Sequence, residues 1–151
     1  MAVIDYALSQ TNYAEGDDND TVFGKWYGMN HQPWCAMFVS WCFGQSGEVA
    51  KVAASTKKGF ASCDAGLKWF AKKGKLITLG EAQRGDIVFF QFDADAEPDH
   101  VGLVLSNSKL TQSLVCIEGN TSPDSKGSQS NGGGVYRKRR KYATVMAVVR
   151  P

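Results

Sequence analysis

The sequence lacks the features that would assign the protein to a membrane, secreted or nucleic-acid-binding class. No stretch approaches the roughly 20 apolar residues that span a bilayer. Residues 1–6 have neither the basic nor the apolar region of a signal peptide. The net charge is only +2, too small to indicate a nucleic-acid partner. We therefore expect one domain over residues 1–151, made in a cytoplasm or cut from a longer chain, with no membrane or nucleic-acid partner.

Cysteine and histidine are scarce, and their spacing does not match the common zinc sites. The two histidines and four cysteines include no Cys-x-x-Cys or Cys–His pair with the spacing of zinc ligands. Cys35 and Cys42 share one predicted helix, where seven residues correspond to about 10 Å along the axis. That separation exceeds the reach of a disulfide, so we expect all four cysteines to be reduced.

What the sequence does contain is a helix-forming stretch, residues 32–43, with a cysteine in its first turn. Pro33 suits a first helical position and Gly47 a helix end. From Cys35 onward, apolar residues recur at i, i+3, i+4, i+7 and i+8, which predicts one continuous apolar face. A cysteine at this position lies near the positive end of the helix dipole, which favours the thiolate. Cys35 is therefore a candidate nucleophile, and the alternative is a small core residue.

The order of the predicted elements indicates an α+β fold. Helices are predicted at 3–10, 33–46 and 62–73. The second half is rich in β-forming residues, and strands are predicted at 76–79, 87–92, 100–105, 114–120, 135–137 and 144–149. Helices followed by five or six short strands predict N-terminal helices packed on an antiparallel sheet.

The acidic loop at residues 15–21 is a weak candidate for a calcium site. It carries three aspartates and an asparagine, whose oxygens suit Ca²⁺. However, their spacing is not that of an EF-hand loop, and no glutamate closes a twelve-residue loop. We expect a solvated acidic loop and no cofactor, with calcium as the alternative.

The basic run at residues 137–141 lies between the last two predicted strands. One interpretation is a solvated turn or a strand edge protected by charge. The other is a patch that binds an anionic surface.

A thiol nucleophile needs a base and a polar group that orients the base. Of the two histidines, His31 precedes the helix of Cys35, whereas His100 opens a predicted strand directly after a loop. On the next strand, Glu118 and Asn120 point to one face, and a buried carboxylate there requires a partner. His100 is the expected partner, which makes these residues a candidate catalytic set with Cys35.

These motifs, in this order, resemble the cysteine, histidine-dependent amidohydrolase/peptidase family, known as the CHAP domain. The resemblance covers residues 13–149 and depends on the segments 28–36, 84–90, 99–104 and 117–121. It implies a papain-like fold similar to that of NlpC/P60 proteins, with a helix-borne nucleophile packed against the sheet. By this resemblance Cys35 is the nucleophile, His100 the base, Glu118 the orienting group and Asn120 a supporting member.

The resemblance is closest to the catalytic domains of bacteriophage endolysins. It implies hydrolysis of an amide bond in bacterial peptidoglycan, as an N-acetylmuramoyl-L-alanine amidase or a stem-peptide or cross-bridge endopeptidase. The protein would be a monomer made in the host cytoplasm and acting on the cell wall, with a wall-binding domain in the same or another chain. The family's calcium-binding members use an aspartate pattern that the loop at 17–20 does not reproduce.

Two residues beside Cys35 are candidate substrate-binding groups. We expect the backbone N–H of Cys35 and the side chain of Gln32 to hold the oxyanion. Trp34 either lines a cleft or packs inward. Other interpretations remain: an NlpC/P60-type cysteine peptidase, which prefers a second histidine in place of Glu118; a non-catalytic wall-binding module; and a phage structural protein that carries this domain.

Overall fold

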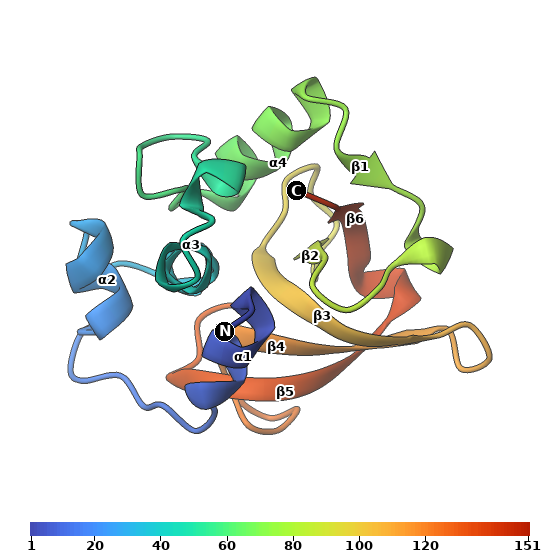
Figure 1. Ribbon diagram of the computed structural model, residues 1–151. Coiled ribbons are helices and arrows are strands. Elements are labelled where there is room, and N and C mark those ends of the chain that lie inside the picture. The colour runs from blue at the N-terminus through green and yellow to red at the C-terminus, as the bar shows by residue number, and fades with distance from the viewer.

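The computed structural model describes all 151 residues and contains four α-helices and one six-stranded antiparallel sheet (Figure 1). The helices are α1 (Val3–Ser9), α2 (Val22–Tyr27), α3 (Cys35–Gln45) and α4 (Cys63–Lys72). The strands are β1 (Leu76–Ile77), β2 (Ile87–Phe90), β3 (His100–Ser108), β4 (Ser113–Thr121), β5 (Gly134–Lys141) and β6 (Val145–Val149). The predicted α+β class is confirmed, in an arrangement compatible with the papain-like fold. No helix has both the length and the apolar character needed to cross a membrane.

The strands lie in the order β1-β6-β2-β3-β4-β5, and every neighbouring pair is antiparallel. Figure 1 shows a curved sheet, with α1 and α3 against one side of it. We call the side that packs on the helices the helix face and the opposite side the far face. Residues alternate between them: Ile87 and Phe89 of β2 join the helix-face cluster, whereas Val88 and Phe90 join the far-face cluster.

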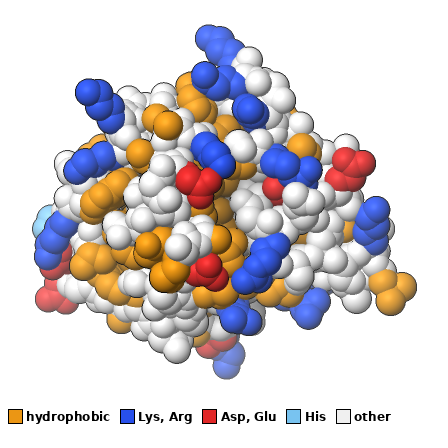
Figure 2. All heavy atoms as spheres, in the orientation of Figure 1, with side chains coloured by type: hydrophobic (Ala, Val, Ile, Leu, Met, Phe, Trp, Pro, Cys, Tyr) orange, Lys and Arg blue, Asp and Glu red, His pale blue; other side chains and the backbone are white.

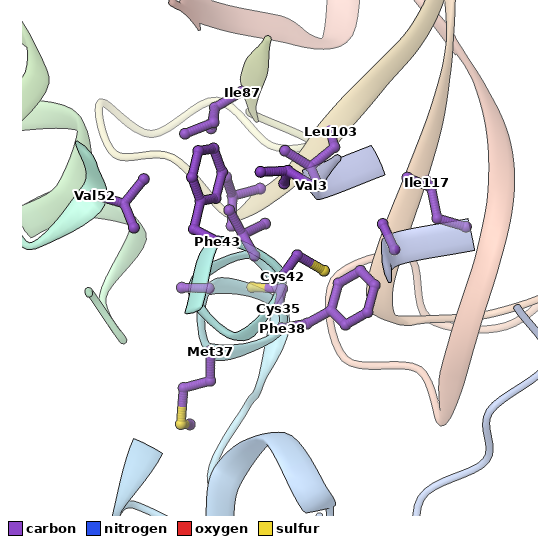
Figure 3. Close-up of a cluster of buried hydrophobic side chains, with 14 of the residues drawn as sticks. Val3, Cys35, Met37, Phe38, Cys42, Phe43, Val52, Ile87, Leu103 and Ile117 are labelled. Carbon is purple, nitrogen blue, oxygen red and sulfur yellow. The ribbon is translucent and has the colours of Figure 1, made fainter. Parts of the chain in front are cut away.

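Helix α3 is the element on which the rest of the fold packs. The predicted apolar face of α3 is confirmed, and the helix is buried on almost every side from Cys35 to Ser40. Figure 3 shows its side chains meeting Ile87, Leu103 and Ile117 of the sheet and Val3 of α1.

The ends of α3 differ slightly from the prediction. The helix begins at Cys35 rather than at Pro33, and Trp34 is the residue that precedes it. Gly47 adopts a φ of 77°, the left-handed conformation that suits a residue just past a helix end. Cys35 is therefore the first residue of a rigid, buried helix.

Of the two forms predicted for the basic run, a solvated turn or a charged strand edge, the structure shows the strand edge, because β5 is the last strand of the sheet. Residues 137–141 belong to β5, and the chain turns afterwards, at Tyr142–Thr144. In β5 the side chains alternate, so Lys138 and Arg140 are buried while their neighbours point to solvent. Lys138 donates to the carbonyl oxygens of Ser122 and Asp124, at 2.8 and 3.1 Å. The run therefore has one internal and one external side, and only the external side is available to a partner.

Candidate active site

Cys35 lies where the N-terminus of α3 meets the sheet. Only 5% of the residue is exposed. The helix can approach β4 this closely because Gly119 has no side chain: a Cβ there would lie 2.8 Å from atoms of Phe38 and Trp34. The position at the helix start places the sulfur beside unpaired backbone N–H groups, which stabilise a thiolate.

His100 is the first residue of β3 and is fully buried. Its Nε2 is 2.9 Å from Oε1 of Glu118. Its Nδ1 has no hydrogen-bond partner in the protein, and Cys35 is the other group, besides Glu118, whose interaction raises the pKa of the ring. The ring lies against Phe90 and Phe92, with centroids 5.9 and 6.0 Å away. These contacts fix the ring between a carboxylate and a thiol.

Glu118 is a fully buried carboxylate on β4, and two features of the fold accommodate it. The first is space, because a Cβ at Gly102 would lie 2.6 Å from the Cγ of Glu118. The second is charge compensation by Arg140 of β5, whose Nε donates to Oε2 at 2.9 Å while its Nη2 donates to Oε1. A buried carboxylate without such partners would be strongly destabilising.

Arg140 is a site residue that the sequence reasoning missed. Its guanidinium lies over the rings of Phe92 and Phe90, 4.8 and 5.4 Å from their centroids. Its Nη1 donates to Oε1 of Gln129 at 3.0 Å. The guanidinium is therefore held by stacking and by hydrogen bonds, and it fixes the carboxylate that contacts His100.

The charges of the site are set by these neighbours. Burial favours the neutral form of Glu118, but the hydrogen bonds and charges of Arg140 and His100 outweigh it and lower the pKa of the carboxyl. Burial likewise opposes protonation of His100, yet the hydrogen bonds to Cys35 and Glu118 raise its pKa from 6.5 to about 9. At neutral pH the ring is therefore an imidazolium beside a carboxylate.

Cys35 has a second sulfur as its neighbour. The Sγ of Cys63, the first residue of α4, lies 3.7 Å from the Sγ of Cys35. The hydrogen bond from the Cys63 thiol, together with the hydrogen bond and charge of His100, lowers the pKa of Cys35 well below its usual range despite burial. The same bond and burial raise the pKa of Cys63. Cys35 is therefore the thiolate of the pair and Cys63 the thiol that donates to it.

Comparison with known proteins agrees with this geometry. The CHAP domain family matches residues 26–120, which is more than half of the chain. The chain belongs to the CHAP domain family. This is a family of hydrolases of the peptidoglycan amidase and peptidase type. A search of curated proteins found no match to the chain.

The family match includes three of the four groups that form the charged network of this CHAP domain. Cys35, His100 and Glu118 fall within residues 26–120, whereas Arg140 lies beyond them in β5. The sequence predicted the first three from their spacing and their residue types. No pattern within the basic run distinguishes Arg140, because all five of its members carry the same charge.

No hydrogen bond joins Asn120 to His100. The pairing of β4 with β5 shifts register between Glu118 and Thr121, which interrupts the alternation on which the prediction depended. Asn120 has a φ of 59°, and its Nδ2 donates to the carbonyl of Ser130 and to Oδ1 of Asn131. The Nδ2 group therefore anchors the 121–134 loop, whereas Oδ1 is buried without a hydrogen-bond partner. The supporting catalytic role of Asn120 stays a prediction.

The two predicted substrate-binding residues, Gln32 and Trp34, differ in their exposure to solvent. Trp34 has no exposed surface, stacks on Phe23 and donates from Nε1 to Oε2 of Glu15 at 2.8 Å. The interpretation of Trp34 as a cleft wall was therefore wrong, because the ring packs inward. Gln32 is exposed near Cys35 and stays a predicted oxyanion donor. His31, the other histidine, is exposed and bonds through Nδ1 to the carbonyl of Asp18 at 2.8 Å.

In the acidic loop considered for calcium, the carboxylate of Asp20 already contacts other side chains of the protein. Oδ1 of Asp20 accepts from Asn30 at 2.7 Å and lies 3.2 Å from Nζ of Lys25. The structure instead gathers three other carboxylates, in the loop before β3, whose oxygens lie within 4.8 Å of one another: Asp93, Asp95 and Asp99. Two of these are exposed. Calcium binding at residues 17–20 stays a prediction.

Proposed function

We propose that this CHAP domain hydrolyses an amide bond of bacterial peptidoglycan, with Cys35 as the nucleophile. The observation that carries the proposal is the network itself: a helix-borne thiolate, an imidazole beside it and a carboxylate 2.9 Å from the far ring nitrogen. A thiolate and a fixed imidazole form the activated pair that acyl transfer requires. Cys42, on the same helix face, has no such partners and its pKa is raised by burial.

In this mechanism the thiolate of Cys35 attacks the carbonyl carbon of the scissile amide. The oxyanion that forms is held by the backbone N–H of Cys35 and by the side chain of Gln32. The imidazolium of His100 then donates a proton to the leaving nitrogen, and the C–N bond breaks. Water, deprotonated by the now neutral ring, hydrolyses the thioester; the sulfur leaves as the thiolate, and the thiolate–imidazolium pair is restored.

Glu118 and Arg140 act through His100 and not on the substrate. The carboxylate accepts from Nε2, which keeps Nδ1 directed to the sulfur and stabilises the imidazolium. Arg140 holds that carboxylate at two oxygens. A carboxylate in this position, where NlpC/P60-type peptidases prefer a second histidine, favours the CHAP chemistry over that alternative.

The biological setting that we propose is a bacteriophage lysin. The domain would act as a monomer on the wall from inside the host, without a cofactor, and a wall-binding domain in the same or another chain would supply most of the affinity. By itself the domain would bind the wall weakly. The fold supports this proposal, because its helices and strands together build one catalytic unit.

The test is mass spectrometry of purified walls digested by the protein. A new amine at L-alanine and a free muramic carboxyl would identify an amidase, whereas new termini inside the stem or cross-bridge would identify an endopeptidase. Cys35→Ala should release no products, whereas Cys42→Ala, the matched change on the same helix face, should release them all. Walls cleared equally by Cys35→Ala would contradict the cysteine mechanism and favour a non-catalytic binding module. Digestion in the presence of EDTA should be unchanged, and its loss would contradict the cofactor-free proposal.

A further inference from the structure

The sulfur of Cys63 forms and breaks no covalent bond in the proposed hydrolysis, yet it lies 3.7 Å from the sulfur of the nucleophile. Cys35 and Cys63 are each the first residue of a helix, α3 and α4. Their Sγ atoms are 3.7 Å apart, whereas Cys42 and Cys116 are fully buried with no sulfur partner. One pair of thiols out of the four is therefore placed for sulfur–sulfur chemistry.

The separation is short enough for a disulfide after a small side-chain movement. A disulfide joins its sulfurs at about 2.05 Å, so the two Sγ atoms would need to approach by about 1.7 Å from the observed 3.7 Å. Both side chains stand at helix starts, where rotation about χ1 moves the sulfur without disturbing the helical hydrogen bonds. Cys63 is partly exposed and Cys35 retains 5% exposure, which gives a small oxidant access to the pair.

We propose that Cys35 and Cys63 form a two-cysteine oxidation site, in which a hydroperoxide oxidises Cys35 and Cys63 converts the product to a disulfide. In the first step the Cys35 sulfur attacks the terminal peroxide oxygen and the O–O bond breaks. One proton is taken up, the hydroperoxide leaves as an alcohol or as water, and Cys35 becomes a sulfenic acid. In the second step the Cys63 sulfur attacks the sulfenic sulfur, the S–O bond breaks and water leaves. Two thiols and one hydroperoxide thus give one disulfide, one alcohol and one water.

The electrostatics of the pair favour this order of events. Cys35 is the more acidic sulfur, and it is the thiolate that reacts with peroxides. The pKa of Cys63 is raised first by its hydrogen bond to Cys35, and also by burial and by the charge on Cys35. Once Cys35 becomes a neutral sulfenic acid that charge disappears, and Cys63 ionises more readily. The first oxidation therefore activates the thiol that completes the second.

The proposal does not rest on the hydrolase function, because it concerns the redox chemistry of two sulfurs. Its consequence for the site is protection. A disulfide is reduced by thiols, whereas a cysteine oxidised to the sulfinic or sulfonic acid is lost. Cys63 would hold the reactive sulfur in the recoverable state.

The test is a peptide map of the peroxide-treated protein, alkylated and digested without reductant. Trypsin places Cys63 alone in the peptide 59–68, and Cys35 together with Cys42 in the peptide 26–51. The expected product is a cross-link between these two peptides that dithiothreitol reverses. Fragment ions must assign it to Cys35, and the same cross-link should form in Cys42→Ala. The peptide 110–126, which contains Cys116, should stay alkylated as an internal reference.

The Cys63→Ser variant sharpens the test, because serine keeps a donor near Cys35 but cannot form the disulfide. With the same peroxide, Cys35 should proceed to the sulfinic and sulfonic acids, and dithiothreitol should not recover its thiol. Circular dichroism of the untreated variant verifies its fold. If the variant fails to fold, the wild-type map still decides: Cys35 overoxidised beside an unmodified Cys63, or a cross-link at Cys42, would overturn the proposal. Full recovery of the Cys35 thiol in a folded Cys63→Ser variant would overturn it as well.

Discussion

The two faces of the sheet are both buried, but they bury different chemistry. The helix face presents apolar side chains, such as Leu103 and Ile117, to α3 and α1. The far face is also apolar where β2 and β6 lie, with Val88 and Val148. Where β3, β4 and β5 lie, it carries a fully buried carboxylate, Glu118. The space-filling view in Figure 2 shows Lys and Arg side chains spread around the displayed surface without one dominant patch.

The difference lies in how each face is stabilised. An apolar side chain is stabilised by its own removal from water, about 1.5–3 kcal/mol for a fully buried Leu, Ile or Phe. A buried charge is stabilised only by partners, and removal of one partner costs about 3–5 kcal/mol because the other is left unpaired. The helix face is thus stabilised by a sum of separate contributions. His100, Glu118 and Arg140 on the far face, together with Cys35 at the start of α3, instead form a network whose members depend on one another.

The largest contrast should come from two alanine substitutions in the same strand, His100→Ala on the network and Leu103→Ala on the helix face. His100→Ala should reduce wall hydrolysis at least about 1,000-fold, because base and nucleophile act together. Leu103→Ala should lower the free energy of unfolding by about 2–5 kcal/mol and leave the activity per folded molecule near wild type. Thermal melts and turbidity assays below the lower melting temperature measure both. An active His100→Ala would remove the base assignment.

The next contrast compares Arg140→Lys with Arg139→Lys, neighbours on opposite sides of β5. Lysine keeps the charge but not the bidentate contact with Glu118 or the stacking on Phe92. We expect Arg140→Lys to lose about 1.5–3 kcal/mol of stability per charged hydrogen bond broken and to lower kcat more than it changes KM. The exposed Arg139→Lys should change stability by no more than about 0.5 kcal/mol.

The same pair of variants carries a pH signature. In the folded protein the pKa of Glu118 is lowered, so its contribution to stability is present above its ordinary pKa and is lost as pH falls through the lowered value. With lysine at 140 the lowering should be smaller, and the loss should begin at a higher pH. Urea unfolding of both variants across the acid range would detect the shift, and identical curves for Arg140→Lys and wild type would show that the guanidinium does not hold the carboxylate.

A smaller effect is expected from pH in the wild-type protein. The pKa of His100 is raised to about 9, so its stabilising contribution is complete below its ordinary pKa of about 6.5 and is lost as pH rises through the folded value. Hydrolysis should decline over the same range, because a neutral ring cannot protonate the leaving nitrogen. NMR titration of His100 should give its pKa directly, and the value should fall in Cys35→Ala, which removes the thiolate. An alkaline limb near pH 7 would contradict the ion pair.

The smallest effect concerns the external side of β5. Exposed charges are screened as the Debye length falls from about 10 Å at 0.1 M salt to about 3 Å at 1 M. If Arg137, Arg139 and Lys141 attract an anionic wall, hydrolysis of walls should decline with salt, and their replacement by serine should flatten that dependence. Hydrolysis of a small soluble peptide serves as the control and should not change. Replacement of Lys138 or Arg140 would be uninformative here, because both are buried.

The contrast between the faces also explains what could be predicted from the sequence. The helix of Cys35 and the strands of the sheet follow from apolar periodicity, which the helix face expresses directly. The five consecutive basic residues of β5 hide the alternation of a strand, so the sequence could not show that Arg140 points inward. The contact between Cys35 and Cys63 joins residues 28 positions apart, and only the fold, which brings the first residues of α3 and α4 together, reveals it. The alternation that predicted Glu118 and Asn120 on one face is interrupted by a register shift between Glu118 and Thr121, which the sequence does not reveal.

The position of Arg140 has a consequence for the order in which the active site is completed during protein synthesis. A chain grown only as far as Asn120 already contains Cys35, His100 and Glu118, but it has no guanidinium to neutralise the carboxylate. The pair Arg140–Glu118 spans 22 residues, and β5 must be added at the edge of the sheet before the pair can form. The nucleophile is among the first site residues to leave the ribosome, and the group that secures its base is the last. The nascent chain therefore carries its reactive cysteine without the finished network that would activate it until β5 has emerged.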